Sequence, residues 1–290
     1  MPTAIRIFLA LIFVTSAASA QITASLQLNK SQYVAGEPVV ATLTITNHAG
    51  RELVFHGDGR RDWLDFNVRN NRGKPVNQRR KEAFGAMRIA AGQSLQRQVD
   101  LTNYYMLHEQ GNFSVAAVIR TLGGDNTVNA MTNRVIFTLN PGRVYWSQKV
   151  GIPGRRNQTR EFRVLQHSGG QRAQLYAQII DDRTGLPIRT FNLGDALSIR
   201  RPSVTVDKDQ RMHVMFISTP TMWVHYVIDL EGNVVNRDIH QRGPQGDPRL
   251  MTSSDGTVRV SNSVPYDPAA AAAARAKTRN ISDRPNVVYE

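Results

Sequence analysis

The chain has 290 residues, of which 41% are hydrophobic, and carries a formal net charge of +13. This hydrophobic content is typical of a globular protein and excludes a wholly disordered one. The sequence has no cysteine, which excludes disulfides, a catalytic cysteine and a lipid anchor on an N-terminal cysteine. We therefore expect domains that are large enough to be stabilised by their hydrophobic cores alone.

Residues 1–20 have the pattern of a secretory signal peptide. Arg6 supplies a positive charge near the start, residues 7–14 form a short apolar run, and small residues lead up to Ala20, as a cleavage site requires. The apolar run is far shorter than the roughly 20 residues of a transmembrane helix. We therefore predict cleavage after Ala20 and a secreted or periplasmic protein without a membrane span.

Residues 21–140 contain seven short segments in which apolar and polar residues alternate, separated by turns rich in Asn and Gly. Alternation with a period of two predicts strands with one buried and one solvated face. The number and spacing of these strands are typical of an immunoglobulin-like β-sandwich. The positions that we expect inside its core are Leu43, Ile45, Phe66, Phe113, Val115 and Phe137.

Several turn motifs in this region are shared with a known family. The sequence YVAGEP at 33–38 leads into LTITN at 43–47, DFNV at 65–68 is followed by NRGKPV at 71–76, and GNFSV at 111–115 opens a late strand. This pattern resembles the sandwich domain of the BsuPI-type, intracellular proteinase inhibitors and related bacterial immunoglobulin-like modules. The resemblance covers residues 21–140 and implies an immunoglobulin-like fold.

Residues 141–264 are also β-patterned, but with an internal repeat. Asp181 and Asp229 follow strand patterns at a spacing of 48, and Asp207 and Asp255 repeat that spacing. A period near 45 with four short strands is in the range of propeller blades. We predict a β-rich domain of two to three blade-like repeats with a weak resemblance to propeller blades, either an open propeller fragment or a second sandwich.

Residues 265–290 are predicted to be a weakly ordered tail. Pro265 and Pro268 end the last strand, and residues 269–277 are rich in alanine. Alanine has the highest helix propensity, so a short helix is expected there. A single helix of that length is marginally stable unless it docks against something.

No local motif for catalysis or metal binding is present. The seven histidines show no His-x-x-x-His spacing, and the sequence has neither a Gly-x-Ser-x-Gly elbow nor a phosphate-binding glycine loop. Acidic residues gather at 56–65 and 207–209, where oxygen ligands could hold Ca²⁺. The alternative is that these aspartates cap turns and pair with arginine. We predict no cofactor, with Ca²⁺ as the alternative.

The excess positive charge lies in arginine pairs that are scattered along the chain. Such charge attracts polyanions, but the pairs are not interleaved with aromatic residues as in a nucleic-acid groove. We therefore predict no specific nucleic-acid binding, and a solvated basic surface is the alternative to polyanion binding. For the aromatic candidates, packing in a core is the alternative to binding. The candidate binding residues are Trp146, Trp223, Tyr226, Arg60, Arg61, Arg155 and Arg156.

These features predict an exported, non-catalytic binding or scaffold protein that recognises a surface, a glycan or a protein partner. The first alternative, an inhibitor or accessory factor of an extracytoplasmic peptidase, depends on the sandwich resemblance. The second, a glycan-active hydrolase, requires paired carboxylates that face one cleft. No oligomeric state follows from the sequence. The carboxylates in question are Asp181, Asp182, Asp207, Asp209 and Asp229.

Overall fold

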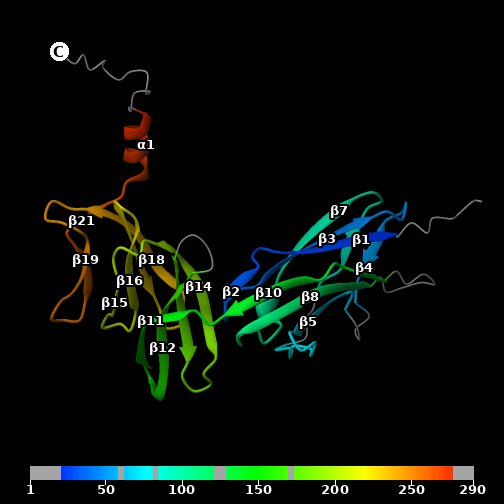
Figure 1. Cartoon of the computed structure of the whole chain (residues 1–290), viewed down its shortest axis with the longest axis horizontal. Coiled ribbons are helices and arrows are strands. Elements are labelled where there is room, and N and C mark those ends of the chain that lie inside the picture. Colours follow the sequence, from blue (N-terminus) through cyan, green and yellow to red (C-terminus); the bar gives the residue numbers. More distant parts are fainter. Residues whose placement is uncertain (1–20, 58–61, 81–83, 121–128, 169–172, 277–290) are drawn as a thin grey trace, which may run out of the picture. The chain divides into compact units, whose positions relative to one another are not determined.

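The computed structural model describes residues 21–57, 62–80, 84–120, 129–168 and 173–276. These residues form antiparallel sheets and one short α-helix (Figure 1). The predicted all-β class is therefore confirmed. The predicted signal sequence lies outside the described residues. The described residues form two compact units, one from segments 21–31, 39–106 and 111–138 and the other from segments 32–38, 107–110 and 139–276.

The chain up to residue 140 forms two main sheets, with strand orders β1-β3-β7 and β2-β10-β8-β5, and a small sheet of β4 and β6. Strand β9 also pairs with β8. All seven predicted segments are strands. The three-residue strands β2, β6 and β9 were not among the predicted segments. The bounds are β1 Ile22–Leu28, β2 Gln32–Val34, β3 Val40–Asn47, β4 Leu53–Phe55, β5 Leu64–Asn70, β6 Met87–Ile89, β7 Ser94–Asp100, β8 Gly111–Arg120, β9 Asn129–Met131 and β10 Val135–Asn140.

The core of the first unit follows the predicted alternation. Along β3, residues at every second position are buried and their neighbours are half-buried, so one face of the sheet is inside. This is the arrangement of a β-sandwich; its immunoglobulin-like character stays a prediction. The six predicted core residues are all buried: Leu43, Ile45, Phe66, Phe113, Val115 and Phe137.

The second unit contains two meanders, each with four consecutive strands, and the second meander gains β21 as a fifth strand. One is a four-stranded sheet with the order β11-β12-β13-β14, and the other has the order β15-β16-β17-β18-β21. Asp181 ends the third strand of the first meander and Asp229 follows the third strand of the second, so the predicted spacing of 48 joins equivalent turns. The bounds are β11 Arg143–Ile152, β12 Arg155–His167, β13 Ala173–Asp181, β14 Pro187–Ala196, β15 Ser203–Val206, β16 Met212–Thr219, β17 Met222–Ile228, β18 Val234–Arg242 and β21 Ser263–Pro265.

The two meanders share a hydrophobic core. Phe162 and Ile179 from the first sheet are fully buried in the same cluster as Met212 and Val214 from the second. In the second sheet, β17 is buried on both faces, because all its residues after Met222 are buried. One face carries the shared core, and the other carries a smaller cluster of Met215, Ile217 and Trp223.

A hairpin packs against this second, outer face. Strands β19 (Arg249–Thr252) and β20 (Val258–Ser261) pair with each other, and Leu250 and Val260 from them contact the outer cluster. The Ala-rich helix is α1, Pro268–Ala276, close to the predicted position. Within the described parts of the chain, no helix combines the length and the apolar character that a bilayer crossing needs.

Candidate functional site

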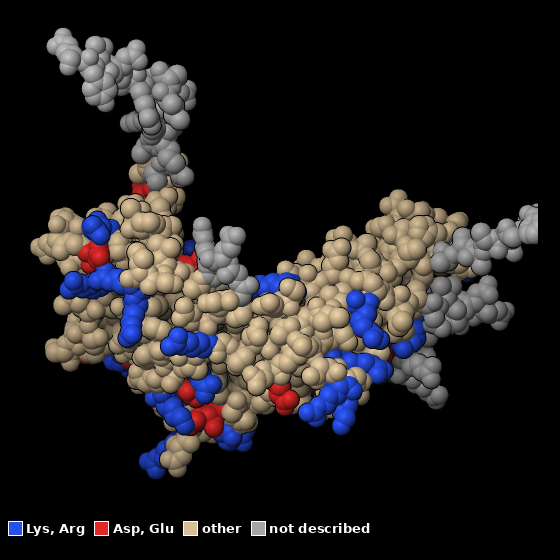
Figure 2. Space-filling model, in the orientation of Figure 1, with Lys and Arg blue, Asp and Glu red and all other residues tan. Residues whose placement is uncertain are grey.

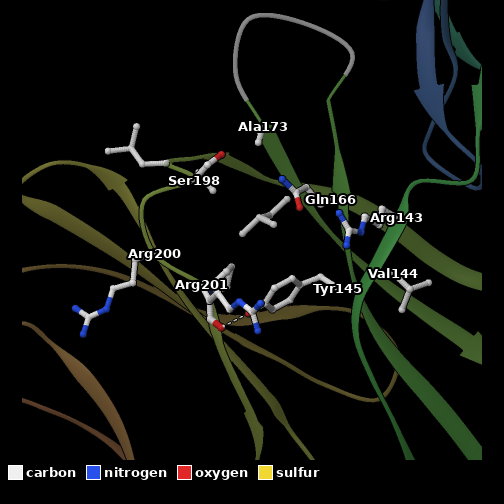
Figure 3. A pocket seen from close by; sticks show the side chains of 12 residues that line it. Arg143, Val144, Tyr145, Gln166, Ala173, Ser198, Arg200 and Arg201 are labelled. Carbon is white, nitrogen blue, oxygen red and sulfur yellow. Dashed lines mark hydrogen bonds between the residues drawn. The ribbon is translucent and has the colours of Figure 1, made fainter.

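A cavity of about 310 Å³ opens at one end of the first meander of the second unit (Figure 3). Its walls come from the start of β11, the ends of β12 and β14, the start of β13 and the segment that leads to β15. Its volume lies at the lower end of the range for small-ligand pockets. The lining residues are Arg143, Val144, Tyr145, Gln166, Ala173, Leu175, Ala196, Leu197, Ser198, Arg200, Arg201 and Pro202.

A β-bulge shapes this end of the sheet. Val144 pairs with Leu165 and Trp146 pairs with Val164, so Tyr145 is an extra residue without a partner in the register. A bulge bends the strand and redirects a side chain, and here the Tyr145 ring borders the cavity. Its hydroxyl donates a hydrogen bond of 3.1 Å to the carbonyl oxygen of Pro202. This bond ties the connecting segment to β11.

Among the described residues that line the cavity, all charged groups are cationic. Of its three arginines, Arg200 forms an ion pair of 2.5 Å with Asp247 and points away from the other side chains (Figure 3). Arg143 and Arg201 are exposed and form no ion pair with a carboxylate of the described residues. A guanidinium has five donors in a planar fork that fits carboxylate and phosphate. Two such groups in one cavity favour an anionic ligand.

The other residues that line the cavity include both polar and apolar side chains. Gln166 pairs directly with Arg143 across β11 and β12, so the amide and the guanidinium lie on the same face of the sheet. The buried side chain of Leu175 is 2% exposed, and Ala173 and Ala196 contribute methyl groups. The combination suits a ligand with an anionic group on a ring or short carbon chain.

Two predicted binding residues are not available to a ligand. Trp223 is 3% exposed and packs with Met215 and Ile217 in the outer cluster. Tyr226 is 8% exposed in the shared core, and its hydroxyl donates to the Leu193 carbonyl at 2.9 Å. The interpretation of these two rings as binding residues is corrected, because both faces of β17 are covered and both rings lie inside.

Trp146, Arg155 and Arg156 do not line the cavity either. Trp146 is half-buried and packs against the shared core. Arg155 and Arg156 are exposed at the other end of β11, where β12 begins. Arg60 and Arg61 lie outside the described residues. On the face shown in Figure 2, Lys and Arg side chains are dispersed and do not form one continuous patch.

The five carboxylates of the hydrolase alternative lie at three turns, and none lines the cavity. Asp182 forms an ion pair of 2.6 Å with Lys149, whose hydrogen bond lowers the pKa of the Asp182 carboxyl. Asp229 accepts hydrogen bonds from the backbone N–H groups of Glu231 and Asn233, and Asp207 caps its turn in the same way. These carboxylates therefore do not form the cleft that the hydrolase alternative requires.

A second polar cluster, which the sequence analysis missed, lies on the outer face of the second sheet. His213, His225 and His240 stand on the neighbouring strands β16, β17 and β18 and are 5%, 6% and 8% exposed. The rings of His213 and His225 are stacked with centroids 5.2 Å apart. Asp238 is directly opposite His225 in the strand register. The sequence signal was Asp238-x-His240, which places two ligand types on one face of a strand.

The environment of His225 and His240 lowers the pKa of both imidazoles. Burial is the main cause that lowers the pKa of His225 to about 4, and the neighbouring His213 and His240 lower it further. Burial also lowers the pKa of His240. Burial has this effect because the charged form of an imidazole loses its hydration.

Comparison with known proteins gives no family. No family model and no curated protein matches the chain. Among solved structures, the chain is similar to Spo0M, a sporulation control protein from Bacillus subtilis, with a TM-score of 0.27 and 14% sequence identity. The match covers 58% of this chain and 82% of that protein.

Proposed function

We propose that this chain is an exported, non-catalytic binding protein that recognises an acidic glycan through the cavity at the end of the first meander. Export is supported by the signal-peptide pattern of residues 1–20. The observation that carries the proposal is the pair Arg143 and Arg201. Both are exposed in a cavity whose described lining residues include no Asp or Glu.

A glycan is favoured over a free inorganic anion by the composition of the walls. The partly exposed Tyr145 ring and the methyl groups of Ala173 and Ala196 provide apolar surface beside the two guanidinium groups. Sugar rings pack on such surface while their carboxylates pair with arginine. Gln166 and Ser198 add neutral hydrogen-bonding groups, which suit hydroxyls.

We expect the net charge to raise the rate of association and the cavity to determine which anionic ligands bind. A charge of +13 steers anionic partners toward the surface, but charge that is screened over about 8 to 10 Å discriminates poorly among them. Selectivity therefore requires the hydrogen-bond donors of the cavity.

The test is calorimetric titration of the purified chain with a uronic acid oligosaccharide and with a neutral oligosaccharide of equal length. Replacing Arg143 and Arg201 together by Ala should weaken binding of the acidic ligand at least tenfold. The matched control replaces Arg155 and Arg156 by Ala, which removes the same charge from exposed positions outside the cavity. Equal losses in the two double variants, or equal binding of the neutral ligand, would contradict the proposal.

A further inference from the structure

The second polar cluster combines ligand types that transition metals prefer. One ligand atom each from His225, Asp238 and His240 lie within 4.8 Å of one another. Two imidazole nitrogens and one carboxylate oxygen form a donor set that suits Zn²⁺ or a similar divalent ion better than Ca²⁺, which takes oxygen ligands.

The unpaired ring nitrogens of His240 are the first observation that points to a ligand in this cluster. It is 8% exposed, and both of its ring nitrogens are buried without a hydrogen-bond partner. Buried polar atoms are nearly always paired, and an unpaired one destabilises the fold. A metal ion bound to His240 would satisfy one of these nitrogens.

A chain of hydrogen bonds sets the tautomer of His225 so that one ring nitrogen can bind a metal ion. The Asp207 carboxylate, which can only accept when it is ionised, is 3.1 Å from Nε2 of His213, so Nε2 of a neutral His213 carries the proton. Nδ1 of His213 then accepts from Nε2 of His225, at 3.1 Å. In neutral His225 this leaves the lone pair on Nδ1, which is free to bind a metal.

The same chain resembles the support that metal ligands receive in known sites. A ligating histidine usually donates its other N–H to an acceptor that fixes its tautomer and orientation. His213 plays that part for His225, and Asp207 fixes His213. Asp207 is itself held, because its other oxygen accepts from the backbone N–H groups of Asp209 and Arg211 at 2.9 and 2.8 Å.

Asp238 offers the third ligand from the partly exposed side of the cluster. It is directly opposite His225 on the adjacent strand and lies two residues before His240, so all three side chains share one face of the sheet. Its Oδ2 accepts a hydrogen bond of 2.6 Å from the amide of Asn236. That bond orients the carboxylate and leaves Oδ1 for an ion.

We propose that His225, Asp238 and His240 form a binding site for a divalent transition metal ion, with Zn²⁺ as the best match, and that His213 and Asp207 are its positioning residues. In a tetrahedral zinc site, ligand atoms are about 3.3 Å apart. The three side chains must therefore move closer together when the ion binds. Three protein ligands leave a fourth position for water or another ligand.

The test measures Zn²⁺ binding to the chelator-treated full chain by competition with a chromophoric chelator, and Co²⁺ binding by absorption spectroscopy. One Zn²⁺ per chain and a higher unfolding temperature are expected. His240→Ala should abolish binding. Because His240 is buried and this variant could unfold, Asp238→Asn is the second variant, and its binding should weaken at least tenfold. His167→Ala, in the same unit, should bind as the unchanged chain does.

His213→Phe tests the positioning role, because it keeps a ring beside His225 but removes the hydrogen bond. Loss of such outer partners weakens metal binding by about 10- to 100-fold. The same variant should also change the Co²⁺ absorption spectrum, which loss of packing alone would not do. The proposal is overturned by an absence of Zn²⁺ binding to the unchanged chain, or by binding that persists in folded His240→Ala and Asp238→Asn.

Discussion

His225 and Asp238 face each other directly across β17 and β18, although the histidine is buried and the aspartate is partly exposed. One member of the pair therefore lies in the interior of the second unit and the other lies near its surface. Because a buried imidazole is hard to protonate, the position of His225 makes the stability of this unit depend on pH.

We expect the free energy of unfolding of the chelator-treated chain to fall as the pH drops from 6.5 toward 4. Burial lowers the pKa of His225 from 6.5 to about 4, so between these values the unfolded chain binds a proton that the folded chain does not. The contribution of neutral His225 to the free energy of unfolding is fully present above pH 6.5. It is lost as the pH falls to about 4, which lowers the free energy of unfolding by about 3 kcal/mol. Urea unfolding at a series of pH values measures it.

The matched variant for this prediction is His225→Leu, which removes the titrating group. Its stability will differ at every pH, so the slope against pH is the quantity to compare. The slope between pH 6.5 and 4 should be smaller in the variant, because His225 no longer contributes to it, whereas His240 and the carboxylates still do. An identical slope in both proteins would show that His225 does not cause the dependence.

Leu43→Asp should unfold the first unit. Leu43 is 1% exposed in the middle of β3, and an unpaired carboxylate there would cost several kcal/mol. Thr44→Asp is the control, because Thr44 is the next residue of the same strand and points to the half-buried face. Thermal unfolding followed by circular dichroism should show a lost or much lowered transition for Leu43→Asp only. Similar melting of both variants would contradict the assigned face.

Gly232→Ala should destabilise the second unit more than Gly185→Ala. Both glycines have positive φ, +81° and +68°, which costs an L-residue about 1 to 2 kcal/mol. A Cβ at Gly232 would also lie 2.9 Å from the Cβ of Arg189, whereas one at Gly185 would meet nothing within 4 Å. The added contact should cost about 1 to 3 kcal/mol more. Equal unfolding free energies for the two variants would be the contrary result.

Strands with one solvent-exposed face were predictable from the sequence. Strands that are buried on both faces were harder to predict. Alternation located the strands and core residues of the first unit, as at Leu43 and Phe137. Strand β17 is buried on both faces, so its sequence is almost continuously apolar and does not say which face each residue takes. For this reason the positions of Trp223 and Tyr226 could not be read from the sequence.

The two polar sites were not predictable, because each combines residues that are far apart in the sequence. His213, His225 and His240 meet through the pairing of three strands, and register is set by the fold rather than by a local motif. Arg143 and Arg201 belong to the start of β11 and to the segment before β15. Scattered arginine pairs in the sequence gave no reason to choose these two.

The most direct test of the proposed glycan recognition is an NMR titration of the isotopically labelled chain with the uronic acid oligosaccharide at physiological salt. The cavity predicts saturable shifts that are largest for Tyr145, Gln166 and Ser198. The exposed pair Arg155 and Arg156 should shift little, because they lie at the other end of β11. Shifts of similar size at the exposed arginines, or none at Tyr145 and Gln166, would show charge attraction without recognition and contradict the account.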